Sequence, residues 1–177
     1  TEDDSAEAVA KRYTHDLEAY NLYLKGVYWR RMLTVDRVSK SIEYFKLAIE
    51  RDPEFALAHA AMGYAYQVLH FYSPKPKKEY YPKAKQAAMR ALELDGTLAE
   101  AHEAMGVVVG YIEKDWRKAE ETFLNIIALN PNYVWAYYHL SCGALFLGDS
   151  DQAIEYIQAA CRLDPLNPVF YRNLGVS

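Results

Sequence analysis

The side chains of this sequence that could take part in chemistry are scattered along it. His59 and His102 stand in the related contexts AHAAMG and AHEAMG. A zinc-protease motif would need a second histidine four residues after His102, and Gly106 stands there instead. Because the two histidines occupy equivalent contexts, we expect them to pack rather than to bind metal.

The remaining reactive groups do not form a recognisable constellation either. Cys142 and Cys161 lie 19 residues apart without a CxxC pair, which predicts neither a zinc site nor a disulfide framework. Neither GxGxxG nor GxxxxGK(S/T), the glycine-rich motifs of nucleotide sites, occurs in the chain. We therefore expect a protein that is not an enzyme, with no catalytic residues, no metal and no cofactor.

Composition and charge narrow the class of partner. The chain is 51% apolar and 25% charged, as expected for a soluble globular protein. Its net charge of −4 disfavours direct binding to nucleic acid or to an anionic membrane. The opening TEDDSAEAVAKRY is acidic and unlike a secretory signal, so we expect a cytoplasmic protein. Lysines nevertheless cluster locally, and either a solvated loop or docking to an acidic partner would explain them: Lys75, Lys77, Lys78, Lys83 and Lys85.

Four related segments indicate internal repeats: FKLAIERDPEF, AMRALELDGTL, FLNIIALNPNY and IQAACRLDPLN. Each ends an apolar helical stretch at a stop residue, and successive stops at Pro53, Gly96, Pro131 and Pro165 are 43, 35 and 34 residues apart. A small residue lies five positions before each stop, except at Ile126. This periodicity predicts helix pairs that stack on one another and share a continuous core.

Leu-Gly-like pairs recur earlier in the units, at Lys25-Gly26, Met62-Gly63, Met105-Gly106 and Leu140-Ser141. Together with the stops, they closely resemble the tetratricopeptide repeat. The resemblance implies an all-α, right-handed superhelix, an α-solenoid of antiparallel helix pairs. We expect a leading helix or linker over 1–15 and a repeat domain over 16–177, whose units are about 16–55, 56–98, 99–133 and 134–167 and the start of a fifth at 168–177.

Three of these units carry extra residues. We expect about three near Leu33 to Asp36, about nine in HFYSPKPKK and one near Lys114. After the longest insertion, the next helix is expected to begin near Tyr80 or Pro82.

In the tetratricopeptide family, certain positions of each first helix line a concave groove that binds protein or peptide segments. The resemblance places aromatic and charged residues at those positions, and the preferred contacts are Tyr20, Tyr23, Arg30, Arg31, Tyr64, Glu103, Tyr111, Trp135 and Tyr138. The second repeat places four more residues at the groove positions: Leu57, Ala60, Gln67 and Val68. As an alternative, some of the rings pack only on neighbouring helices. The carboxylate clamp of chaperone-binding members is absent, since Tyr23, Val27, Tyr64, Glu100 and Ala104 stand at its positions.

These residues favour a non-catalytic scaffold that binds a protein or peptide segment. The alternative function is self-association, in which the chain drives homo-oligomerisation of its parent protein, for example as a homodimer. The segment RYTHDLEAYNLYLKGVYW also resembles the entry into the repeat regions of bacterial multidomain regulators, over about residues 12–60. Those regulators carry winged-helix, nucleotidyl cyclase or Ser/Thr kinase domains, so this resemblance implies the docking or sensory part of a signalling protein.

Overall fold

The computed structural model describes residues 13–32 and 34–175, and every regular element within these ranges is helical. The helices are α2 Leu17–Arg30, α3 Val35–Arg51, α4 Ala56–Tyr72, α5 Tyr81–Leu94, α6 Ala99–Val107, α7 Trp116–Leu129, α8 Val134–Leu147, α9 Ser150–Leu163 and α10 Pro168–Leu174. A short 3₁₀ helix, η1, spans Lys77–Glu79, and a π-helix, η2, spans Val108–Ile112. The all-helical fold predicted from the repeats is confirmed.

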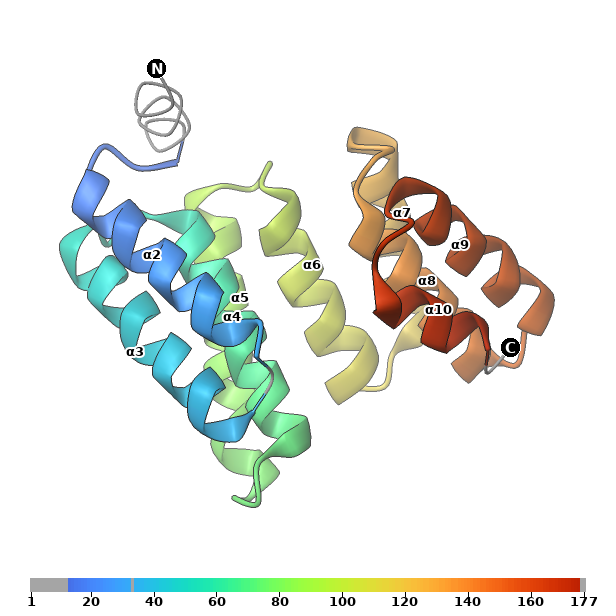
Figure 1. Ribbon diagram of the computed structural model, residues 1–177, viewed down its shortest axis with the longest axis horizontal. Helices are drawn as coiled ribbons and strands as arrows, with labels where there is room; N and C mark the ends of the chain where they lie inside the picture. The colour runs from blue at the N-terminus through green and yellow to red at the C-terminus, as the bar shows by residue number, and fades with distance from the viewer. Residues whose placement is uncertain (1–12, 33, 176–177) are drawn as a thin grey trace. The chain divides into compact units, whose positions relative to one another are not determined.

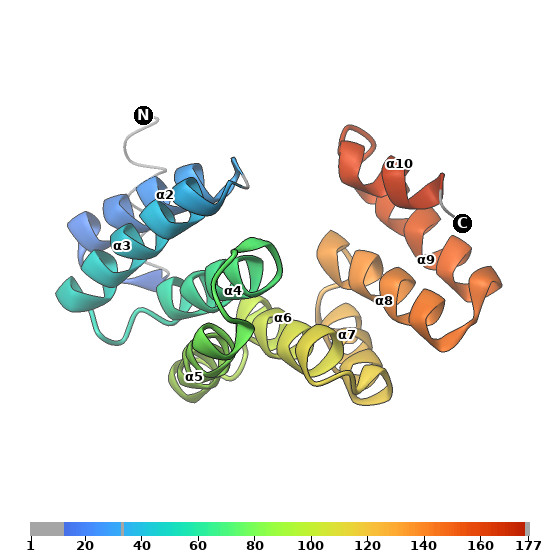
Figure 2. The ribbon, with the colours of Figure 1, turned by 90° about the horizontal axis from the view of Figure 1, so that it is seen from below.

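Consecutive helices pack as antiparallel pairs (Figure 1). Helix α2 packs on α3, α4 on α5 and α8 on α9, while α7 contacts η2. Three second helices also pack on the first helix that follows: α3 on α4, α7 on α8, and α9 on α10 (Figure 2). The described residues form two compact units that divide between Ala104 and Met105, here called unit 1 and unit 2.

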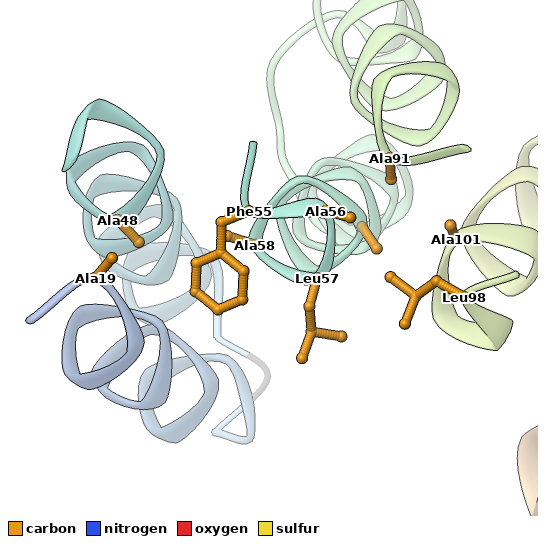
Figure 3. Packing of buried hydrophobic residues seen from close by; sticks show 10 residues of the cluster. Ala19, Ala48, Phe55, Ala56, Leu57, Ala58, Ala91, Leu98 and Ala101 are labelled. Carbon is orange, nitrogen blue, oxygen red and sulfur yellow. The ribbon is translucent and has the colours of Figure 1, made fainter. Parts of the chain in front are cut away.

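Small residues let the helices of unit 1 approach closely. Ala19 of α2 and Ala48 of α3 are both fully buried and point toward each other (Figure 3). The ring of Phe55, which immediately precedes α4, is also fully buried in this cluster. Short side chains at the contact shorten the distance between two helix axes, so the predicted small positions serve helix contact.

The Leu-Gly-like positions face the second helix of the same pair. A Cβ atom on Gly26 would overlap the ring of Phe45, which is fully buried. Ala88 takes the place of that ring in the second repeat, and there a Cβ on Gly63 would come within 3.3 Å of the backbone nitrogen of Ala88. The space that a side chain on the glycine would occupy is thus filled by an aromatic ring in the first pair and by the closer backbone of the second helix in the other.

The stops between repeats share one turn geometry. Four second helices end at an aspartate or asparagine whose backbone N–H donates to the carbonyl four residues earlier: Asp52, Asp95, Asn130 and Asp164. At the first three, the side chain also accepts a hydrogen bond from the backbone N–H two residues on, at 2.9–3.1 Å. These local bonds compete with the helix and help to end it.

Asp16 caps α2 and accepts a hydrogen bond from the backbone N–H of Ala19 at 2.9 Å. Helix α3 begins at Val35, within the stretch Leu33 to Asp36 where we expected about three extra residues. The expected leading segment lies mostly outside the described residues, and so does Leu33.

The long insertion of the second repeat extends one helix and adds a loop. Helix α4 runs on to Tyr72, after which the chain passes through Pro74, Pro76 and η1. Helix α5 then begins at Tyr81 with Pro82 in its first turn, as the sequence predicted.

The third repeat takes up its one extra residue at the end of its first helix, in the π-helix η2 and the turn that follows it. In η2, the backbone N–H of Glu113 donates to the carbonyl of Val108 at 3.0 Å, a bond across five residues instead of four. Lys114 follows with φ at 66°, in the left-handed region. A π-helix holds one more residue in a turn than an α-helix does, so the insertion is absorbed locally.

Candidate functional site

The first helices of unit 1 carry an aromatic and charged surface. We call it the Tyr64 surface, made of Tyr20, Tyr23, Arg30, Tyr64 and Glu103. Tyr20 and Tyr23 lie three residues apart and therefore share one face of α2. All five side chains are half-buried, so each combines a packed part with a part that a partner could reach. Arg31, the sixth predicted residue of this unit, is exposed.

Tyr64 of α4 lies at the centre of this surface. The guanidinium carbon of Arg30 lies 4.7 Å from the centroid of the Tyr64 ring, within reach of a cation–π interaction. Burial raises the pKa of the Tyr64 hydroxyl; the carboxylate of Glu103 adds to this rise, and Arg30 opposes it. The structure thus brings a cation and a carboxylate from two other helices to one neutral ring.

Tyr23 links this surface to the core. Its ring lies 5.9 Å from that of Tyr20 and 5.4 Å from that of Phe55, centroid to centroid. Burial raises the pKa of Tyr23 to about 12, Arg30 opposes the rise and Glu100 adds to it. The two tyrosines of α2 therefore pack on neighbouring rings as well as facing outward.

In unit 2, Trp135 and Tyr138 of α8 pack against the start of the fifth repeat. Their rings lie 5.6 Å apart, and each contacts the ring of Phe170 in α10, at 5.3 and 5.8 Å. Phe170 is fully buried, while Trp135 and Tyr138 stay half-buried. A large part of each of these two rings therefore packs on a neighbouring helix, as the alternative to groove binding expected.

Tyr111 of η2 is also held by its neighbours. Its hydroxyl lies 3.1 Å from Nδ1 of His139, and its ring meets that of Trp116 edge-on at 4.5 Å. Phe146 stacks on the same Trp116 at 4.8 Å and remains 62% exposed, so it presents more ring surface than Tyr111 does. Phe146 stands at a groove position of the repeat but was not among the preferred contacts.

Four residues carried over to the groove from the family pattern are wrong as contacts because they are buried: Leu57, Ala60, Gln67 and Val68, at 2–8% exposed. Helix α4 packs on both α3 and α5, and Nε2 of Gln67 donates to the carbonyl of Ala104 in α6 at 2.7 Å. The family pattern assigns groove positions along one face of a helix. It does not show that neighbouring helices enclose α4 on several sides.

The histidines that we expected to pack also hold the turns between repeats. His59 Nε2 lies 3.1 Å from the carbonyl oxygen of Pro53, and His102 Nε2 lies 2.7 Å from that of Gly96. In the later repeats, a tyrosine hydroxyl donates to the equivalent carbonyl at 3.0–3.1 Å: Tyr137 to Pro131 and Tyr171 to Pro165. Sequence reasoning missed this bond, whose signal is a hydrogen-bond donor six residues after each stop.

Within residues 13–32 and 34–175, no group of three or more His, Cys, Asp or Glu side chains could hold a metal ion. Across the same residues, no helix has the length and apolar character needed to cross a membrane.

Comparisons with known proteins agree with the helix pairs described above. Residues 136–165 match the family model of the tetratricopeptide repeat. The chain is 25% identical over 166 residues to Superkiller protein 3 of Schizosaccharomyces pombe, and the match covers 89% of this chain and 11% of that protein. This chain thus spans about a ninth of the length of that relative.

Solved structures with similar folds include a thermophilic tetratricopeptide-repeat protein of Thermus thermophilus, with a TM-score of 0.74 and 20% identity over 97% of this chain and 86% of that one. Another is pilF of Pseudomonas aeruginosa, with a TM-score of 0.64 and 22% identity over 89% and 66% of the two chains. MamA of Desulfovibrio magneticus gives a TM-score of 0.59 at 20% identity, over 92% and 85%. Residues 136–165 thus match the tetratricopeptide repeat by sequence, and the chain has the fold of tetratricopeptide-repeat proteins.

Proposed function

We propose that this chain is a non-catalytic docking module that binds a protein or peptide segment on the Tyr64 surface. Tetratricopeptide-repeat proteins generally mediate protein–protein interactions, which supports this class of function. The observation that carries the proposal is the half-buried ring of Tyr64, with Arg30 at 4.7 Å and the carboxylate of Glu103 near enough to affect its pKa.

This arrangement suits a partner that is ordered on binding. A tyrosine side chain supplies a large, rigid contact area and loses little conformational entropy on binding. Such residues contribute most of the binding energy at interfaces. Packing already holds the rings of Tyr20 and Tyr23, so little further ordering is needed when a segment docks. Arg30 and Glu103 would select a segment that presents an apolar side chain next to both an acceptor and a donor.

We further propose that the module is the docking or sensory part of a larger, cytoplasmic signalling protein. The resemblance of about residues 12–60 to bacterial multidomain regulators supports this, as does the much greater length of the curated relative. The partner would then bring the neighbouring domains of the parent protein to their target.

The proposal can be tested by capturing the partner and then weakening the contact. A photo-crosslinking amino acid at Tyr20 would trap the bound segment, which is identified and made as a labelled peptide. Tyr64→Ala should weaken its binding by about thirtyfold, the effect of losing about 2 kcal/mol at a hot spot. Fluorescence anisotropy measures the dissociation constant, and circular dichroism checks that helix content is unchanged.

Tyr28→Ala is the matched control, since Tyr28 is also a tyrosine of a first helix but is 58% exposed and outside the Tyr64 surface. Its affinity should stay within twofold of the starting protein. Equal affinity of the Tyr64→Ala protein and the starting protein would rule out this surface as the docking site.

The self-association alternative makes a different prediction for the protein alone. Light scattering over a range of concentrations would show a dimer whose fraction rises with concentration. A constant monomer mass would remove that alternative and leave the docking function standing.

A further inference from the structure

A second groove lies in unit 1, between the two second helices α3 and α5. It has a volume of about 770 Å³, and its lining includes residues of α3, α4 and α5. The groove exists because α3 and α5 both pack on α4, while they make few contacts with each other. None of the five residues of the Tyr64 surface lines it, so it is a separate feature.

The floor and walls of this groove are largely apolar. His59, Met62 and Tyr66 follow one another at spacings of three and four residues and form a stripe of α4 that lines the groove. Ile49 of α3 and Met89 of α5 line it from the two flanking helices, and Met89 is 46% exposed. Methionine adapts its shape easily, so such a groove can fit apolar side chains of differing outline.

The charged residues of the groove are unbalanced. Its lining contains four cationic side chains, Lys46, Lys83, Lys85 and Arg90, but two acidic ones, Glu50 and Glu93. Arg90 pairs with Glu93 at 3.2 Å in an exposed, weak contact, and Lys83 lies 3.8 Å from Glu79. This local surplus of positive charge occurs in a chain whose net charge is −4.

We propose that this groove binds an acidic helical segment of a partner protein, whose apolar side chains enter between α3 and α5 while its carboxylates meet the lysines. Two flanking helices with an apolar floor are the geometry that receives an amphipathic helix. The excess of cations selects against basic segments and speeds encounter with acidic ones. The lysine cluster noted in the sequence thereby gains a specific role, since Lys83 and Lys85 belong to both the cluster and the groove.

The probe is a pair of synthetic helical peptides of about 14 residues, long enough to cover the length of α5. Both carry leucines spaced three and four residues apart, and the other positions carry glutamate in one peptide and lysine in the other. Each is titrated into the isotope-labelled chain, and shifts of the amide and methionine methyl signals are followed by NMR. The glutamate peptide should shift the signals of Met62 and Met89, whereas the lysine peptide should leave them in place.

Two substitutions with controls at the same repeat position test the contact. Met89→Glu should weaken the glutamate peptide at least tenfold, whereas Leu124→Glu, seven residues before its own stop just as Met89 is, should not. Leu124 is 43% exposed, much like Met89, so both variants should fold. Lys83→Glu should also weaken the peptide, by about threefold, and Lys118→Glu serves as its control because each lysine lies thirteen residues before a stop.

Three outcomes would overturn the proposal. Equal shifts by both peptides would show non-specific apolar contact, and unchanged groove signals with the glutamate peptide would show no site. A dimer of the free chain that Met89→Glu abolishes would assign the groove to a second copy instead. Tyr64→Ala should leave binding of the glutamate peptide unchanged, so the result is independent of the Tyr64 surface.

Discussion

At the scale of single residues, the position six residues after each stop shows how different side chains form the same hydrogen bond to the turn between repeats. His59, His102, Tyr137 and Tyr171 all contact the carbonyl oxygen of their stop residue. The shared property is a ring that bears a hydrogen-bond donor. We could predict packing at His59 and His102 from their equivalent sequence contexts. The bond was missed because its signal is only a ring with a donor six residues after each stop, and two different residue types supply that ring.

His59 should make stability depend on pH. Burial lowers its pKa below the ordinary 6.5, against the opposing effect of the Pro53 carbonyl. The folded chain therefore binds fewer protons than the unfolded chain, and its stability is lost as pH falls from 6.5 through the folded pKa. Urea midpoints measured from about pH 5 to 8 should decline on the acid side. His59→Gln keeps a donor without titrating in this range, so its decline should be shallower.

A His59→Gln protein with the same acid slope as the starting protein would assign that slope to other groups. NMR titration of the His59 ring protons gives an independent reading, and a midpoint at or above the ordinary 6.5 would contradict the effect of burial.

At the scale of elements, the pairing of helices was predictable because it depends on local rules. Stops, small residues and Leu-Gly-like pairs marked the ends and contact faces of helices such as α3 and α5. Burial of α4 was not predictable, because it depends on neighbours that come from three different parts of the chain. Gln67 and Val68 were assigned to the groove for this reason and are buried instead.

Replacing Gly106 should show how tightly a helix pair is fitted. A Cβ at this position would lie 2.8 Å from ring atoms of Phe123, which is 1% exposed. Gly106→Ala should therefore lower the free energy of unfolding by about 1–3 kcal/mol. Chemical denaturation measures the change.

Gly96→Ala is the control for this change, because its nearest neighbour, the carbonyl of Leu92, is 3.6 Å away. It should alter stability by less than about 0.5 kcal/mol. The double variant Gly106→Ala with Phe123→Leu should recover part of the loss, since a smaller side chain leaves room for the new methyl group. A Gly106→Ala protein as stable as the Gly96→Ala control would contradict the proposed close fit.

At the scale of the whole molecule, the residue types of the candidate site could be chosen from the sequence, whereas the distances between them depend on how the helices pack. The aromatic and charged positions of the first helices could be chosen from the family resemblance. The meeting of Arg30 and Glu103 beside Tyr64 could not, because these residues lie on three helices, and only the packed structure sets the distances between them. Trp135 and Tyr138 were chosen as groove rings from the same resemblance, but their contact with Phe170 depends on α10.

Stability in stacked helix pairs should be local, since each pair is held by its neighbours in the array. Ile157 of α9 is fully buried, and Ile157→Ala should cost about 2–4 kcal/mol. Hydrogen exchange followed by mass spectrometry should then show faster exchange in α8, α9 and α10, with α2 and α3 nearly unchanged. An equal loss of protection along the whole chain would instead mean that the two units unfold as one.

The π-helix η2 has a consequence for how such arrays vary in length. An extra residue in an ordinary α-helix would rotate all later side chains of that helix by about 100° and turn its apolar stripe away from its partner. By widening one turn at Val108–Ile112, the chain confines the change to that turn, and Trp116 still begins α7 with its ring buried. Repeats of this kind can therefore gain a residue inside a helix during evolution while the helices that follow keep their apolar faces in phase.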